Sequence, residues 1–342
     1  MYRTYFLSND LDKVAYYKKY SNTLNKLKWT CKSSYYKQQF ELNKNNPKNT
    51  WKLIGTIINR KPKGHTVPAK LHYNGQTYTN KHDIVNQFNE YFINIGRNLA
   101  STTHSGIKPD AFLTATHSSS FFLSPVDSAQ VVELALSGLD RHKATIDIPN
   151  YLIKIASNLL STPLTNLFNE SIESGIVPDI FKISKVTPVF KTGAMTDPAN
   201  YRPIAVLSPF AKILERLVYN QLSHFLEKEN ILFKHQFGFR KNYSTEQAIV
   251  ELTDNLKMKI DSNEAICSIF LDLSKTFDTV NHQILPQKLY RYGIRGVPLQ
   301  WFKSYHEGRT QYVEVETNVV YSKVLPLAHF RFWYTSMTCP IV

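Results

Sequence analysis

Cysteine is scarce in this sequence of 342 residues, which contains only Cys31, Cys267 and Cys339. These positions lack the spacing of metal ligands, and three distant cysteines do not build a disulfide framework. This usage suits a reducing intracellular compartment, either the cytoplasm or the nucleus. Long hydrophobic runs are also absent. Because no apolar stretch reaches about 18 residues, we predict no membrane-spanning helix and no membrane partner. Residues 1–8 are too short and too polar for a signal peptide.

Acidic residues are comparatively few. The chain has 41 Lys and Arg against 27 Asp and Glu, a net charge of +14. The imbalance is concentrated in residues 1–64, where 14 Lys or Arg stand against 3 Asp or Glu, a balance of +11. A strongly basic chain predicts a polyanionic partner, and nucleic acid is the default expectation.

The basic segment has a helical pattern. Residues 11–35 carry apolar side chains at roughly helical spacing, which predicts one long helix interleaved with Tyr and Trp29. A second helix is predicted from about Thr50. Two interpretations of this segment stay open. It is either a solvated helix face or an arm that contacts phosphates, since alternating basic and aromatic residues suit a nucleic-acid backbone.

Hydrophobic residues make up 42% of the chain and aromatic residues 13%, enough for a sizeable folded core. Asn74-Gly75 between alternating residues predicts a β-hairpin, and an amphipathic helix is predicted from Ile84 to Leu99. Residues 101–124 are rich in Ser, Thr and His, and we interpret them as a linker.

Local signals are dense from Ser124 onward. In chain order they are a helix start at Ser124-Pro125, one or two helices over 150–175 that break near Pro163 and end at Gly175, a strand over 182–191, a helix start at Ser208-Pro209, and a capping box at Ser244–Gln247. Because strand and helix signals mix without a regular βαβ alternation, we predict an α+β fold.

One stretch, residues 266–282, stands out. Its first half is a short apolar run of strand length, which predicts a strand in the middle of a sheet, with Asp272 at its end. A carboxylate is costly to bury unless it is paired or holds a metal. Asp278 is better explained as a helix N-cap, and His282 as a packing or hydrogen-bonding residue.

The sequence Leu-Asp-Leu-Ser-Lys-Thr-Phe-Asp-Thr-Val-Asn-His at 271–282 resembles the catalytic motif of reverse transcriptases of non-LTR (LINE-like) retrotransposons. Further pieces resemble the same family in the same order: Asn200–Ile204, Gln236–Arg240 with Ser244-Thr245, Tyr290–Ile294, and Arg309–Gln311. The resemblance covers roughly residues 70–324. It implies the fingers and part of the palm of a right-hand polymerase, preceded by a basic, mainly helical extension.

The resemblance also implies an activity, RNA-directed DNA polymerisation, with an RNA template, a DNA primer and deoxynucleoside triphosphates as partners. The cofactor it implies is Mg²⁺, with Mn²⁺ as an alternative. Hard cations take carboxylate ligands, and in the family the aspartate that matches Asp272 bridges two metal ions. Nucleotidyl transfer with two such ions places them about 4 Å apart.

The other site residues come from the same resemblance. The Leu273 carbonyl would line the triphosphate side. Phe277 matches the bulky residue that selects deoxynucleotides, and it is equally suited to a core position. Lys191 and Arg240 are the candidates for gripping the incoming triphosphate. Arg202 would contact the template or hold the fingers together.

The resemblance stops near Leu325. The family continues with Gly-x-Pro-Gln-Gly and an aromatic-x-Asp-Asp hairpin, but this sequence has no Asp-Asp pair and no aspartate after Asp278. We expect a frameshift or a misjoined gene near this point, and no endonuclease domain is recognised. The segments expected are 1–64, a basic helical extension; 65–123, a hairpin, helix and linker; 124–324, partial fingers and palm; and 325–342, an aberrant tail.

These departures leave two functions open. The chain is a reverse transcriptase fragment that is catalytically incomplete as written, or a non-enzymatic remnant that only binds nucleic acid.

Overall fold

The structure, a computed structural model, describes residues 11–58, 68–101, 116–140, 146, 148–272, 284–315 and 318–323. Contacts between Cα atoms divide the chain into two units, Met1–Gly64 and His65–Val342, and each is described by itself. No helix in the described ranges has both the length and the apolar character needed to cross a bilayer.

The first unit is a pair of helices. The predicted basic helix is confirmed as α2 (Leu11–Asn43), and the second as α3 (Pro47–Ile57). Asn46 caps α3 by accepting a hydrogen bond from the Asn49 amide, and Pro47 fits the first helical turn. Apolar side chains of α2 are not gathered on a buried face: Trp29 is 72% exposed and Leu27 is 59% exposed. The described residues of this unit therefore bury no core of their own.

The second unit contains a four-stranded sheet with strand order β4-β3-β5-β6. The strands are β3 (Ile183–Phe190), β4 (Tyr201–Leu207), β5 (Thr310–Val315) and β6 (Asn318–Lys323). β3 is antiparallel to β4 and parallel to β5, and β6 is antiparallel to β5. The predicted strand over 182–191 is confirmed by β3. Mixed pairing and segregated helices make this an α+β fold, as predicted.

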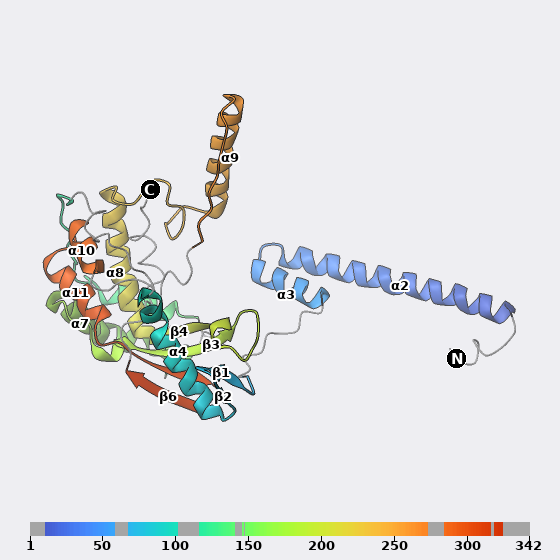
Figure 1. The fold of residues 1–342 in the computed structure, drawn as a ribbon, viewed down its shortest axis with the longest axis horizontal. Helices are drawn as coiled ribbons and strands as arrows, with labels where there is room; N and C mark the ends of the chain where they lie inside the picture. The colour runs from blue at the N-terminus through green and yellow to red at the C-terminus, as the bar shows by residue number, and fades with distance from the viewer. Residues whose placement is uncertain are drawn as a thin grey trace. The chain divides into compact units, whose positions relative to one another are not determined.

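One face of this sheet packs against α4 (Lys81–Ser101), which lies across the sheet in Figure 1. Val186 and Val313, which are paired across β3 and β5, share a core with Ile84, Phe88 and neighbouring side chains of α4. A hydrogen bond of 2.8 Å from Gln311 to Asn89 crosses this interface. The hairpin of β1 (Leu71–Tyr73) and β2 (Gln76–Tyr78) confirms the Asn-Gly prediction, since both turn residues have positive φ.

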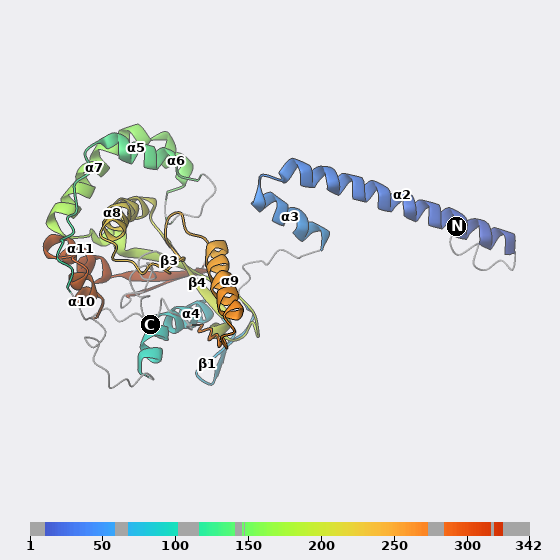
Figure 2. The same cartoon turned by 90° about the horizontal axis from the view of Figure 1, so that it is seen from above.

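A second core is built by helices. It joins α5 (Ala129–Ser137), α6 (Asn150–Ile155), α7 (Ser157–Ser174), α8 (Pro209–Lys228), α10 (Ile284–Arg291) and α11 (Gly296–His306). Seen from above, α5, α6 and α7 form an arc around α8 (Figure 2). The centre of α8 is fully buried at Val218 and Leu222, and Trp301 of α11 is equally enclosed. Two short 3₁₀ helices, Asp179–Lys182 and Pro198–Asn200, precede β3 and β4.

Two helix boundaries differ from the prediction. The helix expected at Ser124-Pro125 begins at Ala129, with Ser128 as the N-cap. Ser124 is instead held by the Gln221 side chain, which accepts from its amide at 2.8 Å and donates to its carbonyl at 2.9 Å. The expected break near Pro163 is also wrong. Pro163 lies on the exposed side of α7, where water can satisfy the carbonyl freed four residues earlier.

Other end signals are confirmed. Gly175 adopts φ +70° after α7, Ser208-Pro209 starts α8, and Ser244 and Gln247 form both hydrogen bonds of the capping box of α9 (Thr245–Asp261). None of the described side chains of α9 is buried, and this helix projects from the rest of its unit (Figure 1).

The segment 116–123 docks on the turn that follows α10. His117 donates its amide to Arg291 at 2.7 Å, and Phe121 donates to Gly293 at 2.8 Å. Gly293 has φ +92°, and a Cβ at this position would overlap the carbonyl oxygen of Ser119. A glycine is therefore required here by both the backbone conformation and the close approach.

We expect Gly293→Ala to lower the free energy of unfolding by about 3 kcal/mol or more, because strain and overlap add. Gly308→Ala is the matched control. Gly308 also has positive φ, +67°, but nothing lies within 4 Å of the place that an added methyl group would take, so about 1–2 kcal/mol is expected. Urea unfolding of both variants measures the difference, and equal losses would show that the contact with Ser119 has no energetic weight.

Candidate nucleotide and nucleic-acid site

The predicted site residues come from three segments of the second unit. Lys191 and Arg202 lie on the β3–β4 hairpin, Arg240 lies in the loop between α8 and α9, and Asp272 follows α9. Leu273 and Phe277 lie outside the described residues, as do Asp278 and His282.

The prediction of a buried strand before Asp272 is wrong. Residues 265–272 form neither helix nor strand, and Phe270 and Leu271 are 81% and 84% exposed. None of the four strands of the described sheet pairs with them. An apolar strand is stable in a sheet only with hydrogen-bonded neighbours, and these residues have none within the described part of the chain.

The described carboxylates do not fit a two-metal centre. Asp272 is exposed, and no group of three or more His, Cys, Asp or Glu that could hold a metal ion occurs among the described residues. One bridging carboxylate supplies one oxygen to each of two ions, whereas each Mg²⁺ calls for ordered octahedral coordination. The described part of the chain thus provides at most one element of the expected metal site.

Lys191 is presented by a well-defined loop. Its amide donates to the Asn200 carbonyl at 2.8 Å, and the Asn200 side chain donates to Ala194 at 3.0 Å. Gly193 has φ +94° and lies so close to the Asn200 side chain that a Cβ would meet it at 2.8 Å. The hairpin β1–β2 supports the same loop through a hydrogen bond of 2.7 Å from His72 to Thr196.

Arg202 lies opposite Val189 on the neighbouring strand and is exposed. Because strand residues alternate between faces, this register places Arg202 on the face away from α4. The exposed cation is available for contact with another molecule from that face.

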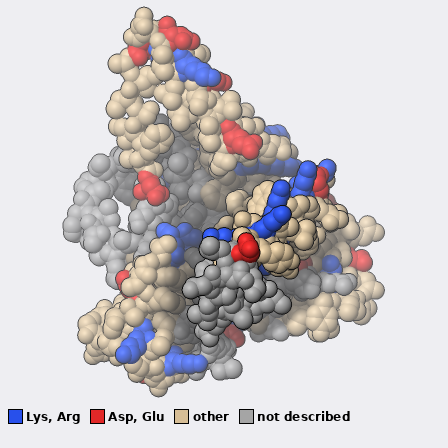
Figure 3. All heavy atoms as spheres, turned by 90° about the vertical axis from the view of Figure 1, so that its right-hand side faces the viewer, with Lys and Arg blue, Asp and Glu red and all other residues tan. Residues whose placement is uncertain are grey.

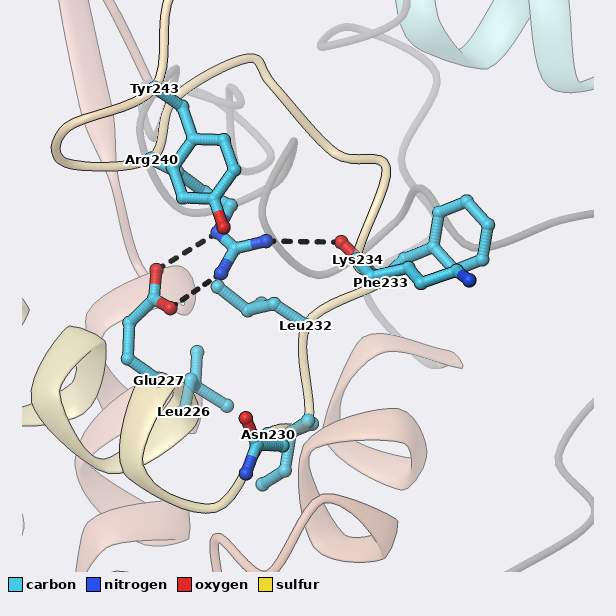
Figure 4. A pocket seen from close by; sticks show the side chains of 9 residues that line it. Leu226, Glu227, Asn230, Leu232, Phe233, Lys234, Arg240 and Tyr243 are labelled. Atoms are coloured by element: carbon cyan, nitrogen blue, oxygen red, sulfur yellow. Dashed lines mark hydrogen bonds and ion pairs between the residues drawn. The ribbon is translucent and has the colours of Figure 1, made fainter. Parts of the chain in front are cut away.

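Arg240 is engaged within the protein (Figure 4). Its Nε and Nη2 donate to the two carboxylate oxygens of Glu227, at 2.9 and 2.6 Å, and Nη1 donates to the Phe233 carbonyl at 3.1 Å. The ring of Tyr243 lies 4.1 Å from the guanidinium carbon. The Arg240 side chain is only 9% exposed, and its hydrogen bonds to Glu227 raise the pKa of Arg240.

Glu227 was not singled out by the sequence. It occupies the last turn of α8, 13 residues before Arg240, and no local pattern couples two residues at that distance. The polar cluster of Glu215, Tyr305 and Arg309 was likewise missed. The Tyr305 hydroxyl donates to Glu215, and Arg309 is buried beside the Tyr305 ring at 4.4 Å. Burial raises the pKa of both Glu215 and Tyr305. The Arg309-Thr310-Gln311 motif was the available signal for this cluster.

Surface charge on one face is shown in Figure 3. Lys and Arg side chains of the described residues lie there in several groups, with Asp and Glu side chains between them. Residues 65–342 carry 27 Lys and Arg against 24 Asp and Glu, so their balance is only +3. Most of the net positive charge of the chain, +11 of +14, therefore belongs to the first 64 residues.

Comparison with known proteins shows which family the sequence resembles. Residues 189–327 match the family described as reverse transcriptase (RNA-dependent DNA polymerase). The chain is 28% identical over 211 residues to a probable RNA-directed DNA polymerase from transposon BS of Drosophila melanogaster. It is 29% identical over 192 residues to that of transposon X-element, and 30% identical over 173 residues to that of mobile element jockey, both from the same fly.

These matches cover 59%, 55% and 49% of this chain. They cover 22%, 21% and 18% of the relatives, so the chain spans about a fifth of the length of the proteins it matches. The motifs recognised in the sequence between Asn200 and Gln311 all lie within the matched range, residues 189–327. Residues 189–327 therefore carry part of a reverse transcriptase domain, and the relatives that the chain resembles are RNA-directed DNA polymerases of non-LTR retrotransposons.

Proposed function

We propose that the chain is the fingers and part of the palm of an RNA-directed DNA polymerase, preceded by a basic extension that binds nucleic acid. The family match over residues 189–327 is the observation that carries this proposal. The proposed partners of the whole protein are an RNA template, a DNA primer and deoxynucleoside triphosphates. Its proposed cofactor is Mg²⁺ or Mn²⁺.

Within this proposal, the β3–β4 hairpin supplies two cations. Lys191 contacts the phosphates of the incoming nucleotide, and its ordered loop supports this because the backbone that carries the cation loses little freedom on binding. Arg202, exposed on the same hairpin, contacts the template. Arg240 is the second candidate for the triphosphate.

The residues proposed for catalysis do not form a complete metal site. Asp272 is proposed as one metal ligand, Leu273 as part of the nucleotide site and Phe277 as the residue that excludes a ribose 2′ hydroxyl. The described residues do not assemble the remaining ligands. We therefore propose that these 342 residues bind substrates without polymerising them. The alternative, a remnant that only binds nucleic acid, shares this inactivity but predicts no repairable catalytic centre.

Completion of the domain separates the two functions. The segment that carries the aromatic-x-Asp-Asp hairpin in a relative such as the jockey protein would be joined after residue 324. RNA-templated primer extension by this completed enzyme supports the polymerase proposal. No extension, while the relative's own intact domain extends the same primer, would favour the binding remnant.

A further inference from the structure

We propose that Glu227 is an internal competitor for phosphate at Arg240. In the free protein the Glu227 carboxylate is hydrogen-bonded to the Arg240 guanidinium. A bound phosphate oxyanion displaces the carboxylate from the guanidinium. This inference rests on the proposed function, which assigns Arg240 to a triphosphate, and it adds the residue that sets the affinity of that site.

The first support is geometric. Glu227 accepts two parallel hydrogen bonds from Arg240, at 2.9 and 2.6 Å. This fork is also the arrangement in which arginine binds two oxygens of a phosphate. The Glu227 oxygens therefore occupy the positions that phosphate oxygens would take, and Arg240 cannot present the same edge to both anions.

The second support is the difference in exposure between the two partners. The Arg240 side chain is 9% exposed, whereas that of Glu227 is 36% exposed. A nearly buried guanidinium needs an anion beside it, but a carboxylate at the surface can return to water at small cost. The partner that leaves is therefore Glu227, and the group that replaces it must carry negative charge.

The third support is the space beside the pair. A cavity of about 530 Å³ adjoins it, and the lining residues include Asn230, Leu232 and Tyr243 together with Glu227 and Arg240. In Figure 4 the ring of Tyr243 and the carboxylate of Glu227 lie beside the guanidinium at the edge of this space. The volume falls within the range of small-ligand sites, so a polyphosphate has room to approach.

The loop itself supplies the fourth support. Phe239 and Asn242, which flank Arg240, have φ values of +61° and +66°. Non-glycine residues adopt this left-handed region infrequently, and a bulky residue such as Phe239 persists in it only where surrounding contacts hold the backbone. The contacts of Arg240 lie between these two residues. Because a phosphate would replace one charged acceptor by another, exchange preserves an anchor for the strained loop.

The experiment measures binding of a fluorescent deoxynucleoside triphosphate to the full 342-residue chain and its variants. Glu227→Gln removes the competing charge and is expected to tighten binding about five- to tenfold. Glu229→Gln is the matched control, since it removes one charge two residues away. Glu229 contacts Ser119 at 2.7 Å rather than Arg240, so the affinity of this variant should stay within about twofold of that of the original chain.

Glu227→Asp is a second variant in case Glu227→Gln does not fold. It keeps the charge but shortens the side chain, and tightening of about two- to threefold is expected from the weakened fork. Inorganic tripolyphosphate and a single-stranded oligonucleotide are added as competitors. Stronger competition by tripolyphosphate in Glu227→Gln assigns the exchange to free polyphosphate, and stronger competition only by the oligonucleotide assigns it to a nucleic-acid phosphate.

Unchanged or weaker binding in the Glu227 variants would overturn the exchange, as would equal tightening in Glu229→Gln. If the original chain binds and Glu227→Gln binds no better, the exchange fails while the nucleotide-binding proposal stands. If neither chain binds any of the three phosphate ligands, both fail together.

Discussion

Asn in place of Asp272 is expected to lower the rate of RNA-templated extension by about 10³-fold or more in the completed enzyme, which carries the relative's hairpin after residue 324. The substitution keeps the size of the side chain and removes one negative charge. A hard divalent cation prefers carboxylate oxygen to amide oxygen where charge must be balanced. Positioning and charge stabilisation make up most of catalysis in phosphoryl transfer.

The measurement is single-turnover primer extension with both proteins at saturating primer–template. Asp261→Asn is the matched control, because Asp261 ends α9 and has no proposed role at the metal. Its rate should stay within about twofold of the completed enzyme. A fall of less than about tenfold in Asp272→Asn would remove Asp272 from the catalytic centre.

Removal of residues 1–64 is expected to weaken binding of RNA or DNA by about 100-fold or more at low salt. These residues hold +11 of the net charge of +14, and the helices that carry them expose Trp29, Tyr35 and Trp51. Each phosphate neutralised by Lys or Arg releases counterions, and the logarithm of the affinity falls with a slope of about −0.9 per contact on duplex DNA. Aromatic stacking adds affinity without sequence preference.

Filter binding of the full chain and of residues 65–342 across a salt series tests this expectation. The full chain should show the steeper salt dependence, and the two affinities should converge at high salt. The division of contacts at residue 64 makes this truncation the natural one. Equal affinities with equal slopes would assign the basic helices to a solvated surface, the other interpretation of their sequence.

Local signals in the sequence predicted several elements because the interactions that determine them are short-ranged. The Asn74-Gly75 turn, the capping box at Ser244 and the left-handed Gly175 each depend on a few neighbouring residues. Where distant side chains compete, the prediction failed. Ser124 is held by Gln221, 97 residues away, and this contact outweighs a reasonable local start signal for a helix.

The candidate site divides in the same way. Resemblance supplied Asp272, Lys191 and Arg240, because these residues lie in recognisable local motifs. It did not supply Glu227, whose contact with Arg240 is known only once α8 and the following loop are placed. The buried strand predicted before Asp272 failed for a related reason, since a strand requires partners that periodicity alone does not reveal. Leu273 and Phe277 remain predictions.

Primer extension on an RNA template by the 342-residue chain itself tests whether these residues bind substrates without polymerising them. Purified chain, deoxynucleoside triphosphates and Mg²⁺ or Mn²⁺ would be compared with the same chain carrying Asp272→Asn. We expect the chain to bind primer–template and to leave it unextended, with no difference between the two proteins. Extension by the original chain that Asp272→Asn lacks would contradict this expectation. Another acid, such as Glu314, which pairs with Lys185 in the structure, would then have to complete the metal site.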